Sequence, residues 1–233
     1  MEKKRIVVFT GAGISAESGL KTFRGHDGLW EGHRVEDVAT PEAWKKNAPL
    51  VQEFYNQRRK SCLAATPNAA HMALVLLEEK YQVDIITQNV DDLHERAGSV
   101  RILHLHGEIV KAQSSVDPRL VYRIQGDEIK MGERCSEGSQ LRPYIVWFGE
   151  AVPAMVDAVR LAKRADILIV IGTSLQVYPA ANLVYEIEET CDIYIIDPCA
   201  GTYTVPSRTI VIDKTATEGV PDLVQYLLEY GNG

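Results

Sequence analysis

Two histidines stand two residues apart in the stretch LHLHGE, residues 103–108, directly before a glycine and a glutamate. An imidazole ionises near neutral pH, so either His104 or His106 has the chemistry of a general base. Alternate residues of an extended strand point to the same face, so the spacing alone does not choose between them. A histidine at a strand end more often has a structural role than a catalytic one. The residues that could bind a ligand nearby must show which role applies here.

A glycine-rich stretch, GAGISAESG, follows the first apolar run and fits the pattern G-x-G-x-x-A with Gly11, Gly13 and Ala16. In this pattern the first glycine makes a tight turn, the second lets the backbone approach a pyrophosphate, and a helix N-terminus attracts the anion. The motif alone also fits an ordinary glycine-rich turn. Its place at the end of a predicted strand favours a dinucleotide site.

Polar side chains crowd the stretch ITQNVDDLHERAG, which also follows a predicted strand. The amide of Asn89 and the carboxylate of Asp91 have the donors and acceptors to pair with a carboxamide such as that of nicotinamide. Asp91 and Asp92 equally suit the cap of a short helix over LHERA, and the sequence leaves both roles open.

A second strand-to-glycine turn, VIGTSLQVYPA, places Thr173 and Ser174 where they would donate to phosphate or ribose. Dehydrogenases use an acidic residue about 20 positions after the first glycine motif, and the stretch TFRGHDGLWEGH does not follow that pattern. An ordinary hydride-transfer dehydrogenase therefore fits poorly. Asp197, at the end of a predicted strand, is the alternative group for the adenosine ribose, and a role as a turn cap stays equally open.

The elements that position these residues are short strands separated by helices. Several apolar runs have consecutive apolar residues, which suits strands buried on both faces of a parallel sheet. Strands are predicted at 5–10, 83–88, 101–106, 144–148, 166–172, 192–197 and 209–213, and helices at 68–80, 153–164 and 179–189. This alternation predicts an α/β fold with a doubly wound parallel sheet, which binds ligands at the carboxyl ends of its strands.

Two polar segments interrupt the alternation and predict a smaller inserted lobe. Residues 25–66 are rich in Trp, His and Arg with helical periodicity over 49–65, and residues 107–141 include a predicted hairpin over 120–131 that turns at Gly126-Asp127. The larger domain would consist of residues 1–24, 67–106 and 142–233. A cleft between the two parts would lie over the strand ends.

Composition excludes several classes of function. The net charge of −7 argues against a protein that coats nucleic acid, because phosphate contacts need clustered Lys and Arg. The sequence lacks an apolar run of about 18 residues for a membrane span, and its start does not fit a signal peptide. We expect a cytoplasmic protein without nucleic-acid or membrane partners, and the sequence predicts no oligomeric state. The four cysteines form no C-x-x-C pair, so neither a disulfide framework nor a standard zinc site is indicated.

Five motifs, GAGISAESGLKTFRG, TQNVDDLHERAG, HLHGE, VWFGE and GTSLQVYPAA, follow one another in an order and at separations that resemble the sirtuin family of NAD-dependent protein-lysine deacylases. They span nearly the whole chain. The resemblance implies a Rossmann-like NAD-binding domain with a small lobe, NAD as co-substrate, and acylated-lysine proteins or peptides as substrates. It also implies that the acyl group moves to the ribose, which gives nicotinamide, free lysine and O-acyl-ADP-ribose.

The resemblance also implies roles for single residues. His106, directly before the glycine of LHLHGE, matches the family's general base, and His104 does not. Phe23 and Arg24 match a loop that closes over the nicotinamide ribose. The implied NAD-binding residues are Gly11, Ala12, Gly13, Ala16, Glu17, Phe23, Arg24, Gln88, Asn89, Asp91, His106, Gly172, Thr173, Ser174 and Asp197. The implied peptide-binding segment and acyl tunnel contain Val146, Trp147, Phe148, Gly149, Glu150 and Val177.

A tyrosine and an arginine in EFYNQRRK resemble the pair of the class III subgroup, which also removes succinyl or malonyl groups. Tyr55 and Arg58 are three residues apart and share a face of a helix. An arginine at the inner end of the tunnel would form a bidentate pair with an acyl carboxylate, worth about 1.5–3 kcal/mol when shielded. The alternative is an exposed arginine in a basic helical turn, which we expect of Arg59.

The chain departs from the family pattern in two places. Sirtuins usually carry two cysteine pairs between HGE and RP that hold a structural zinc, and this chain has only Cys135 there. Four thiolates cannot be assembled from one, so we predict no zinc. The second departure is Asp197, where the family often has an asparagine, and it bears on the affinity for NAD.

The leading hypothesis is therefore an NAD-dependent lysine deacylase acting on acetyl and acidic acyl groups. The alternatives are a mono-ADP-ribosyltransferase on the same scaffold and a non-catalytic reader of NAD or acyl-lysine.

Overall fold

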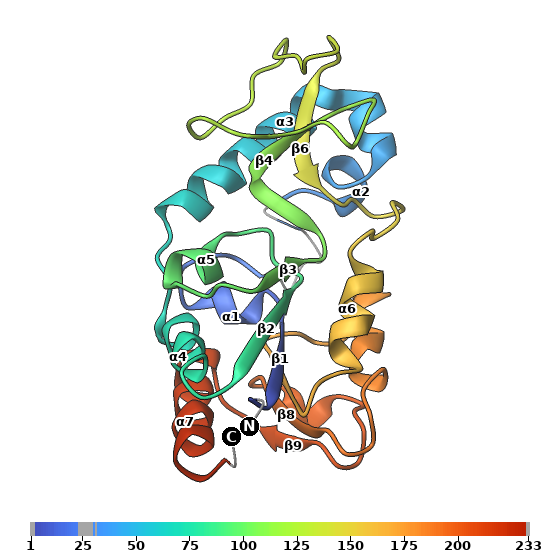
Figure 1. The fold of residues 1–233 in the computed structure, drawn as a ribbon. Helices are drawn as coiled ribbons and strands as arrows, with labels where there is room; N and C mark the ends of the chain where they lie inside the picture. The colour runs from blue at the N-terminus through green and yellow to red at the C-terminus, as the bar shows by residue number, and fades with distance from the viewer. Residues whose placement is uncertain (1–2, 23–29, 31, 232–233) are drawn as a thin grey trace.

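A computed structural model describes residues 3–22, 30 and 32–231 of the chain. Its larger sheet has six strands in the order β3-β2-β1-β7-β8-β9, and all neighbours are parallel (Figure 1). The strands are β1 (Arg5–Thr10), β2 (Gln82–Thr87), β3 (Ile102–His104), β7 (Ile167–Ile171), β8 (Asp192–Ile196) and β9 (Ile210–Ile212). The chain direction across the sheet reverses between β1 and β7, and open α/β sheets bind ligands at such a switch point.

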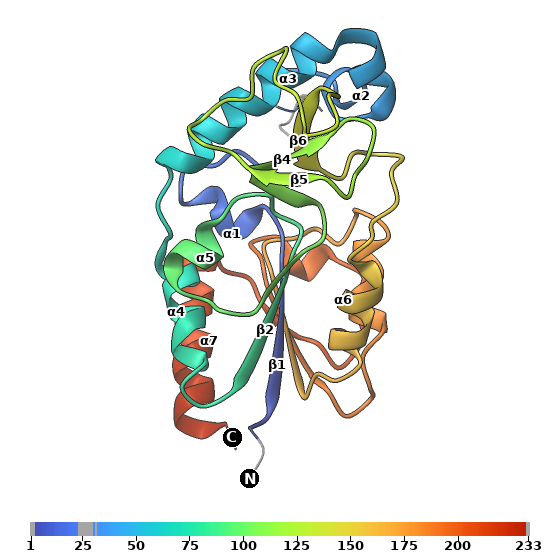
Figure 2. The ribbon, with the colours of Figure 1, turned by 45° about the horizontal axis from the view of Figure 1, so that its top comes forward.

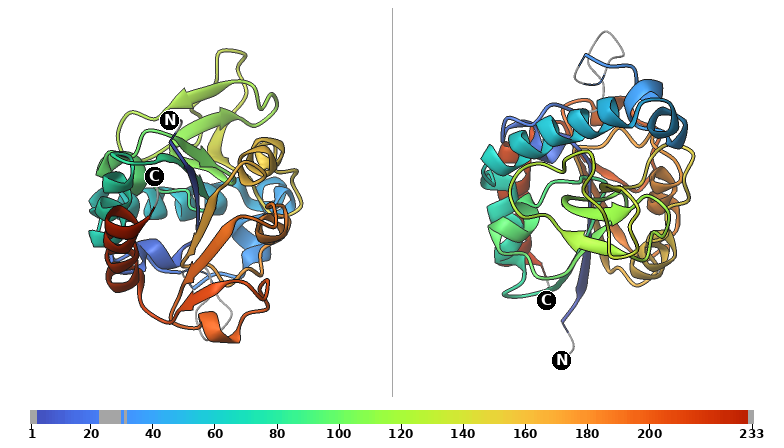
Figure 3. Two further views of the ribbon diagram at one scale, coloured as in Figure 1. Left: turned by 60° about the horizontal axis from the view of Figure 1, so that its bottom comes forward. Right: turned by 90° about the horizontal axis from the view of Figure 1, so that it is seen from above.

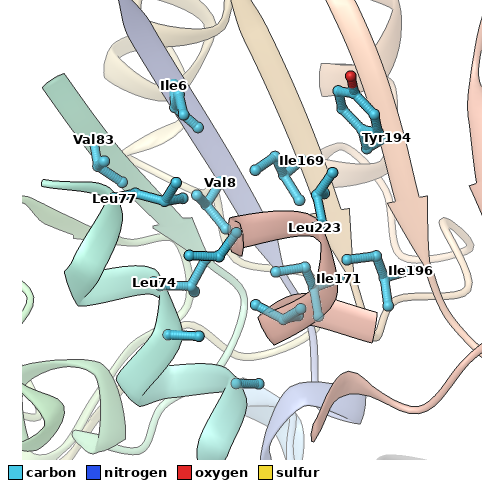
Figure 4. Packing of buried hydrophobic residues seen from close by; sticks show 14 of the residues in the cluster. Ile6, Val8, Leu74, Leu77, Val83, Ile169, Ile171, Tyr194, Ile196 and Leu223 are labelled. Carbon is cyan, nitrogen blue, oxygen red and sulfur yellow. The ribbon is translucent and has the colours of Figure 1, made fainter. Parts of the chain in front are cut away.

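The larger sheet is covered by helices on both faces, as the sequence predicts. One face carries α4 (Ala69–Leu77) and α7 (Ala216–Tyr230), and the other carries α6 (Met155–Ala162) and the 3-10 helix η1 (Ala180–Tyr185). Ile6 and Val8 of β1 pack in the first core together with Leu223 (Figure 4). Val7 and Phe9 pack in the second. Since both faces are buried, consecutive positions of a strand are apolar.

A smaller antiparallel sheet lies over one end of the larger sheet (Figure 2). Its order is β5-β4-β6, and its elements with the helices beside it are β4 (Gly107–Ser114), β5 (Val121–Arg123), β6 (Leu141–Ile145), α2 (Val35–Val38) and α3 (Pro41–Ala64). Seen from above, this sheet and α3 cover the carboxyl ends of the parallel strands (Figure 3). A third apolar cluster, which includes Val51, Tyr55 and Trp147, packs α3 against β4 and β6.

The helix α3 is bent near its start for a local reason. Its N-cap, Thr40, accepts a hydrogen bond from the amide of Ala43 at 3.0 Å. Asn47 has non-helical angles, with φ −153° and ψ 70°, and Pro49 follows without an amide to donate. The side chain of Asn47 accepts from the amide of Leu50 at 3.2 Å, which starts the long second part of the helix.

Several predicted elements differ from the structure. The stretch 144–148 overlaps β6, which pairs with β4 in the smaller sheet and not with the parallel strands. The predicted hairpin over 120–131 is wrong, because β5 pairs with β4 and residues 127–131 form no strand. The predicted helix over 179–189 is the 3-10 helix η1, and α7 is not among the predicted elements.

The division into two domains stays a prediction. Within it, β6 belongs to the smaller sheet although the predicted boundary assigned residues 142–233 to the larger domain. The remaining short elements are α1 (Gly13–Ala16), α5 (Leu93–Ala97) and the 3-10 helix η2 (Ala200–Thr202). Throughout the described ranges, we find no helix whose length and apolar character would let it span a bilayer.

Candidate active site

A cleft of about 650 Å³ lies where the carboxyl ends of β1, β2, β7 and β8 meet α3 and the segment after β6. Most of the predicted site residues line it. They are Gly11, Ala12, Gly13, Tyr55, Arg58, Gln88, Asn89, Asp91, His106, Val146, Trp147, Phe148, Gly149, Glu150, Gly172, Thr173, Ser174, Val177 and Asp197. Of the predicted residues that the structure describes, Ala16 and Glu17 are absent from the lining. Phe23 and Arg24 lie outside the described residues.

Two glycine turns meet back to back at the floor of the cleft. The amide of Gly13 donates to the carbonyl of Gly172 at 2.8 Å, and the amide of Gly11 donates to Ile171 at 3.0 Å. A Cβ atom on Gly13 would lie 2.5 Å from the Cα of Gly172, so a side chain has no room there. The glycines allow this close contact between the two turns and also line the cleft, and the approach of a pyrophosphate at Gly13 stays a prediction.

Three other amides of the two turns remain for an anion. Within the described parts of the chain, the backbone amides of Ala12, Thr173 and Ser174 donate to no protein group. All three residues line the cleft. Backbone amides that converge at strand-to-helix turns are a recurrent phosphate site, so these residues fit a pyrophosphate.

A polar network anchors the turn after β2. The Asn89 side-chain amide donates to the carbonyl of Gly11 at 3.1 Å and to Ser15 Oγ at 3.2 Å. Ser15 Oγ donates to Asp91 Oδ2 at 3.1 Å, while Asp91 Oδ1 accepts from the amide of Leu93 at 3.2 Å. Asp91 therefore binds the first helical amide of α5 and also lines the cleft, and its burial raises the pKa of its carboxyl. Ser15 is absent from the predicted site because it occupies a variable position of the glycine motif.

His106 is arranged as a base. Its Nδ1 lies 3.0 Å from the carbonyl oxygen of Gln88, which can only accept, so Nδ1 carries the proton and Nε2 is the basic nitrogen. Burial lowers the pKa of His106 because it disfavours the charged ring, and the carbonyl of Gln88 partly offsets this effect. A partly buried imidazole that is neutral at pH 7 and lines the cleft can remove a proton from a bound hydroxyl.

His104 is arranged differently. Its Nδ1 lies 3.0 Å from the carbonyl oxygen of Asn89, and its Nε2 lies 2.8 Å from Glu95 Oε1. His104 does not line the cleft. Both ring nitrogens face acceptors, so neither is available as a base, and the geometry agrees with the choice of His106.

Tyr55 and Arg58 form the part of the cleft beneath α3. The side chain of Tyr55 is buried, and burial raises the pKa of its hydroxyl, against a smaller opposing effect of the Arg58 charge. The Trp147 indole lies close enough to lower that pKa slightly, but the hydroxyl has no hydrogen bond of normal geometry among the described residues. The guanidinium carbon of Arg58 lies 4.3 Å from the ring centroid of Trp30, a stacking contact that orients it.

The expectation that Arg59 is an exposed, solvated residue is wrong. Arg59 is fully buried, with Nε donating to the carbonyl of Ile109 at 2.7 Å and Nη1 donating to Asn56 Oδ1 at 2.7 Å. Asn56 in turn exchanges two hydrogen bonds with the backbone of Ile129, at 2.9 and 3.0 Å. These contacts tie α3 to β4 and to the loop that follows β5.

The segment after β6 is held rigidly by an internal ion pair. Arg142 Nη2 donates to Glu150 Oε1 at 2.9 Å, and Glu150 Oε2 accepts from the amide of Trp147 at 2.8 Å. The guanidinium carbon of Arg142 lies 3.8 Å from the ring centroid of Trp147. Glu150 lines the cleft, as predicted for a substrate residue, but its carboxylate is occupied by Arg142 and the segment itself.

Asp197 caps a turn and also lines the cleft, so the role toward the adenosine ribose stays a prediction. Its Oδ1 accepts from the amide of Cys199 at 2.9 Å, which caps the turn, and from the hydroxyl of Tyr203 at 2.7 Å. Burial raises the pKa of Tyr203, and the bond to Asp197 adds to this effect. Asp197 and Tyr203 both line the cleft, and nothing in the motif pattern points to the tyrosine.

Glu17 has a structural partner in place of the expected cofactor contact. Its carboxylate accepts from the amide of Thr217 at 3.0 Å and from the hydroxyl of Thr217 at 2.6 Å. These bonds place a negative charge at the start of α7, where the helix dipole favours it. Neither Glu17 nor Ala16 lines the cleft, and their predicted contact with NAD stays a prediction.

No group of three or more His, Cys, Asp or Glu side chains within the described ranges is placed to hold a metal ion. Cys135 instead lies in a polar turn, where Sγ is 3.1 Å from Ser139 Oγ and the amide of Cys135 donates to the carbonyl of Ser139 at 2.8 Å. Ser139 Oγ is also 2.7 Å from Ser114 Oγ of β4. The absence of zinc stays a prediction that metal analysis can test.

Comparisons with known proteins identify close relatives. The model of the family described as "Sir2 family" matches residues 11–179. A Helicobacter pylori protein named "NAD-dependent protein deacylase" is 55% identical over 226 residues, which cover 97% of this chain and 98% of the relative. A "Sir2 homolog–NAD complex" has a TM-score of 0.86 and 38% identity, covering 98% of this chain and 91% of its own. A Sir2 variant in complex with deacetylated p53 peptide and 3'-O-acetyl ADP ribose has a TM-score of 0.74 and 28% identity, covering 99% and 95%.

Proposed function

The chain belongs to the Sir2 family, and we propose that the cleft at the strand ends is its active site as an NAD-dependent protein deacylase. NAD is the co-substrate, and acylated-lysine proteins are the substrates. The observation that carries the proposal for the site is the place of His106. His106, whose Nε2 is the basic nitrogen, lines the same cleft as the backbone amides without an acceptor and the buried aromatic side chains of Tyr55 and Trp147.

Three sets of residues would hold NAD. The amides of Ala12, Thr173 and Ser174 offer donors to the pyrophosphate. Asn89 and Asp91 would address the nicotinamide and its ribose, because the network around Ser15 fixes both side chains beside the cleft. Asp197 would accept from the adenosine ribose through Oδ2, since Oδ1 is occupied by Cys199 and Tyr203.

Bound NAD supplies a sugar carbon that is activated by its bond to nicotinamide. The contribution of His106 is to take a proton at Nε2 from a hydroxyl brought beside it. The aromatic side chains of Tyr55 and Trp147 are buried and exclude water, which would otherwise consume the activated sugar by hydrolysis. The rigid segment after β6 positions Trp147 for this purpose.

We further propose that succinyl and malonyl groups are removed as well as acetyl groups. Arg58 and Tyr55 lie three residues apart on α3 and line the same cleft. The guanidinium of Arg58 stacks on Trp30, and a guanidinium pairs with a carboxylate through two parallel hydrogen bonds, to which the Tyr55 hydroxyl would add a donor. An acetyl group has no carboxylate, so it would gain nothing from Arg58.

Incubation with NAD and matched acetylated or succinylated peptides tests the proposal. A deacylase gives a peptide that loses the mass of the acyl group, together with nicotinamide and O-acyl-ADP-ribose. A peptide that gains ADP-ribose would instead support the mono-ADP-ribosyltransferase alternative. Failure to release nicotinamide from any acyl-peptide would support the non-catalytic reader.

A cytoplasmic location and the lack of nucleic-acid and membrane partners stay predictions from composition. Fractionation of cells that express the full chain would test the location.

A further inference from the structure

His104 has an acceptor at each of its ring nitrogens. Nδ1 is 3.0 Å from the carbonyl oxygen of Asn89, and Nε2 is 2.8 Å from the carboxylate of Glu95. Carbonyls and carboxylates only accept hydrogen bonds, so both nitrogens of the ring carry protons. The His104 side chain is only 8% exposed, and the imidazolium is therefore paired with Glu95 in a shielded position.

The charge balance around the ring agrees with this geometry. Burial alone lowers the pKa of His104, but the hydrogen bond to Glu95 and the charge of that carboxylate raise it above the usual value. The pKa of Glu95 is lowered, because the same bond and charge outweigh its own burial. His104 is thus a fixed double donor.

The two histidines of LHLHGE hold two consecutive carbonyl groups. His106 donates to the carbonyl of Gln88, and His104 donates to that of Asn89. Both carbonyls belong to the turn after β2, whose Asn89 and Asp91 side chains line the cleft. In the described ranges, no group other than His104 donates to the carbonyl of Asn89.

We propose that His104 is a positioning residue for NAD. Its Nε2 is held by Glu95 and its Nδ1 donates to the carbonyl of Asn89, which fixes the turn that presents Asn89 and Asp91 to the cleft. The inference rests on the proposed roles of these two residues toward NAD. It assigns different tasks to His104, the last residue of β3, and His106, which lies in the bend between β3 and β4. His106 handles the proton, and His104 fixes the binding turn.

Two isosteric substitutions separate the bonds of His104. Asn places its amide nitrogen where Nδ1 stands, so His104→Asn keeps the donor to Asn89 and loses the bond to Glu95. Gln places its nitrogen where Nε2 stands, so His104→Gln keeps the bond to Glu95 and leaves the Asn89 carbonyl without its donor. Glu95→Gln is the matched control, because the ring can still donate to Asn89 from Nδ1.

Steady-state kinetics with NAD and with acetylated peptide give the readout. We expect His104→Gln to raise the KM for NAD about tenfold, with the KM for the peptide within about twofold of the starting protein. His104→Asn and Glu95→Gln should raise the KM for NAD by less than about threefold. A role in filling space alone predicts equal effects of the Asn and Gln variants, and this result, or an unchanged KM for NAD in His104→Gln, would overturn the inference.

Binding of NAD to Asn89→Ala separates this inference from the proposed site. If Asn89→Ala weakens NAD binding and His104→Gln does not, the positioning role of His104 is wrong while the site stands. If Asn89→Ala binds NAD normally, the proposed NAD site itself is wrong, whatever the role of His104. Nitrogen NMR of the imidazole in the unaltered protein, should it show only one protonated ring nitrogen at pH 7, would overturn the double-donor state directly.

Discussion

The Nδ1 atom of His106 lies 3.0 Å from the carbonyl oxygen of Gln88, the residue that directly follows β2. This contact joins the start of the smaller sheet to the floor of the cleft and decides the tautomer of the ring. The proton stays at Nδ1, and the basic nitrogen is Nε2. Because Gln88 also donates to Thr173 Oγ1 at 3.0 Å, the orientation of the base is linked to the second glycine turn.

The ionisation of His106 predicts the pH dependence of turnover. Burial lowers its pKa below the usual value of 6.5, and only the neutral ring can act as a base. The turnover rate at saturating substrate should therefore have reached its plateau at neutral pH. It should fall only when the pH drops below the usual pKa of a histidine. A pH profile of kcat checks this. An acid limb centred above pH 7 would contradict it.

Replacement of Arg58 should separate acidic from neutral acyl groups. Arg58→Met removes the proposed partner of an acyl carboxylate and keeps the length of the side chain, so desuccinylation should fall roughly ten- to hundredfold. Deacetylation should change much less. Lys60→Met is the matched control, because Lys60 is an exposed cation of the same helix that does not line the cleft. Equal losses with both peptides would mean that Arg58 acts only in packing.

The contact between Asn56 and Ile129 should contribute to the stability of the smaller sheet. Asn56→Ala leaves the amide and carbonyl of buried Ile129 without partners and removes an acceptor from Arg59. We expect a loss of about 2–4 kcal/mol in the free energy of unfolding, measured by urea titration. Gln57→Ala, at an exposed position beside it, should change this free energy by less than about 0.5 kcal/mol. Equal losses would contradict the role of Asn56.

Metal analysis should find less than one zinc per chain in the purified protein. The polar turn that contains Cys135, Ser139 and Ser114 provides one thiol, and four ligands are needed for a structural zinc. A chelator should accordingly leave the unfolding temperature unchanged. Stoichiometric zinc, or destabilisation by the chelator, would overturn the prediction.

Strands that are buried on both faces are the part of the fold best predicted from the sequence. The runs around Val8, Ile169 and Ile195 are apolar at successive positions because a parallel sheet covered by helices buries every residue. The stretch 144–148 is equally apolar, but its pairing with β4 depends on a partner far away in the chain. Periodicity predicts a strand and not the sheet to which it belongs.

Site residues within motifs are predictable, whereas their supports are not. His106, Asn89 and Asp91 stand in recognisable stretches and all line the cleft. Arg59 is predicted on the surface because arginine is usually exposed, but in the interior its Nε donates to the distant carbonyl of Ile109 and its Nη1 to Asn56 of the same helix. Tyr203 reaches Asp197 only through the fold of the loop after β8. Such contacts depend on how the chain folds and leave no recognisable motif in the sequence.

The variant His106→Asn tests the central claim most directly. The Asn amide can replace Nδ1 as the donor to Gln88, so the turn is preserved while the basic nitrogen is removed. In parallel measurements of NAD binding and of deacylated peptide, we predict binding within about threefold of the unaltered protein and a loss of turnover of at least about a hundredfold. Turnover that persists within a few-fold while NAD binds normally would contradict His106 as the base and the assignment of the cleft.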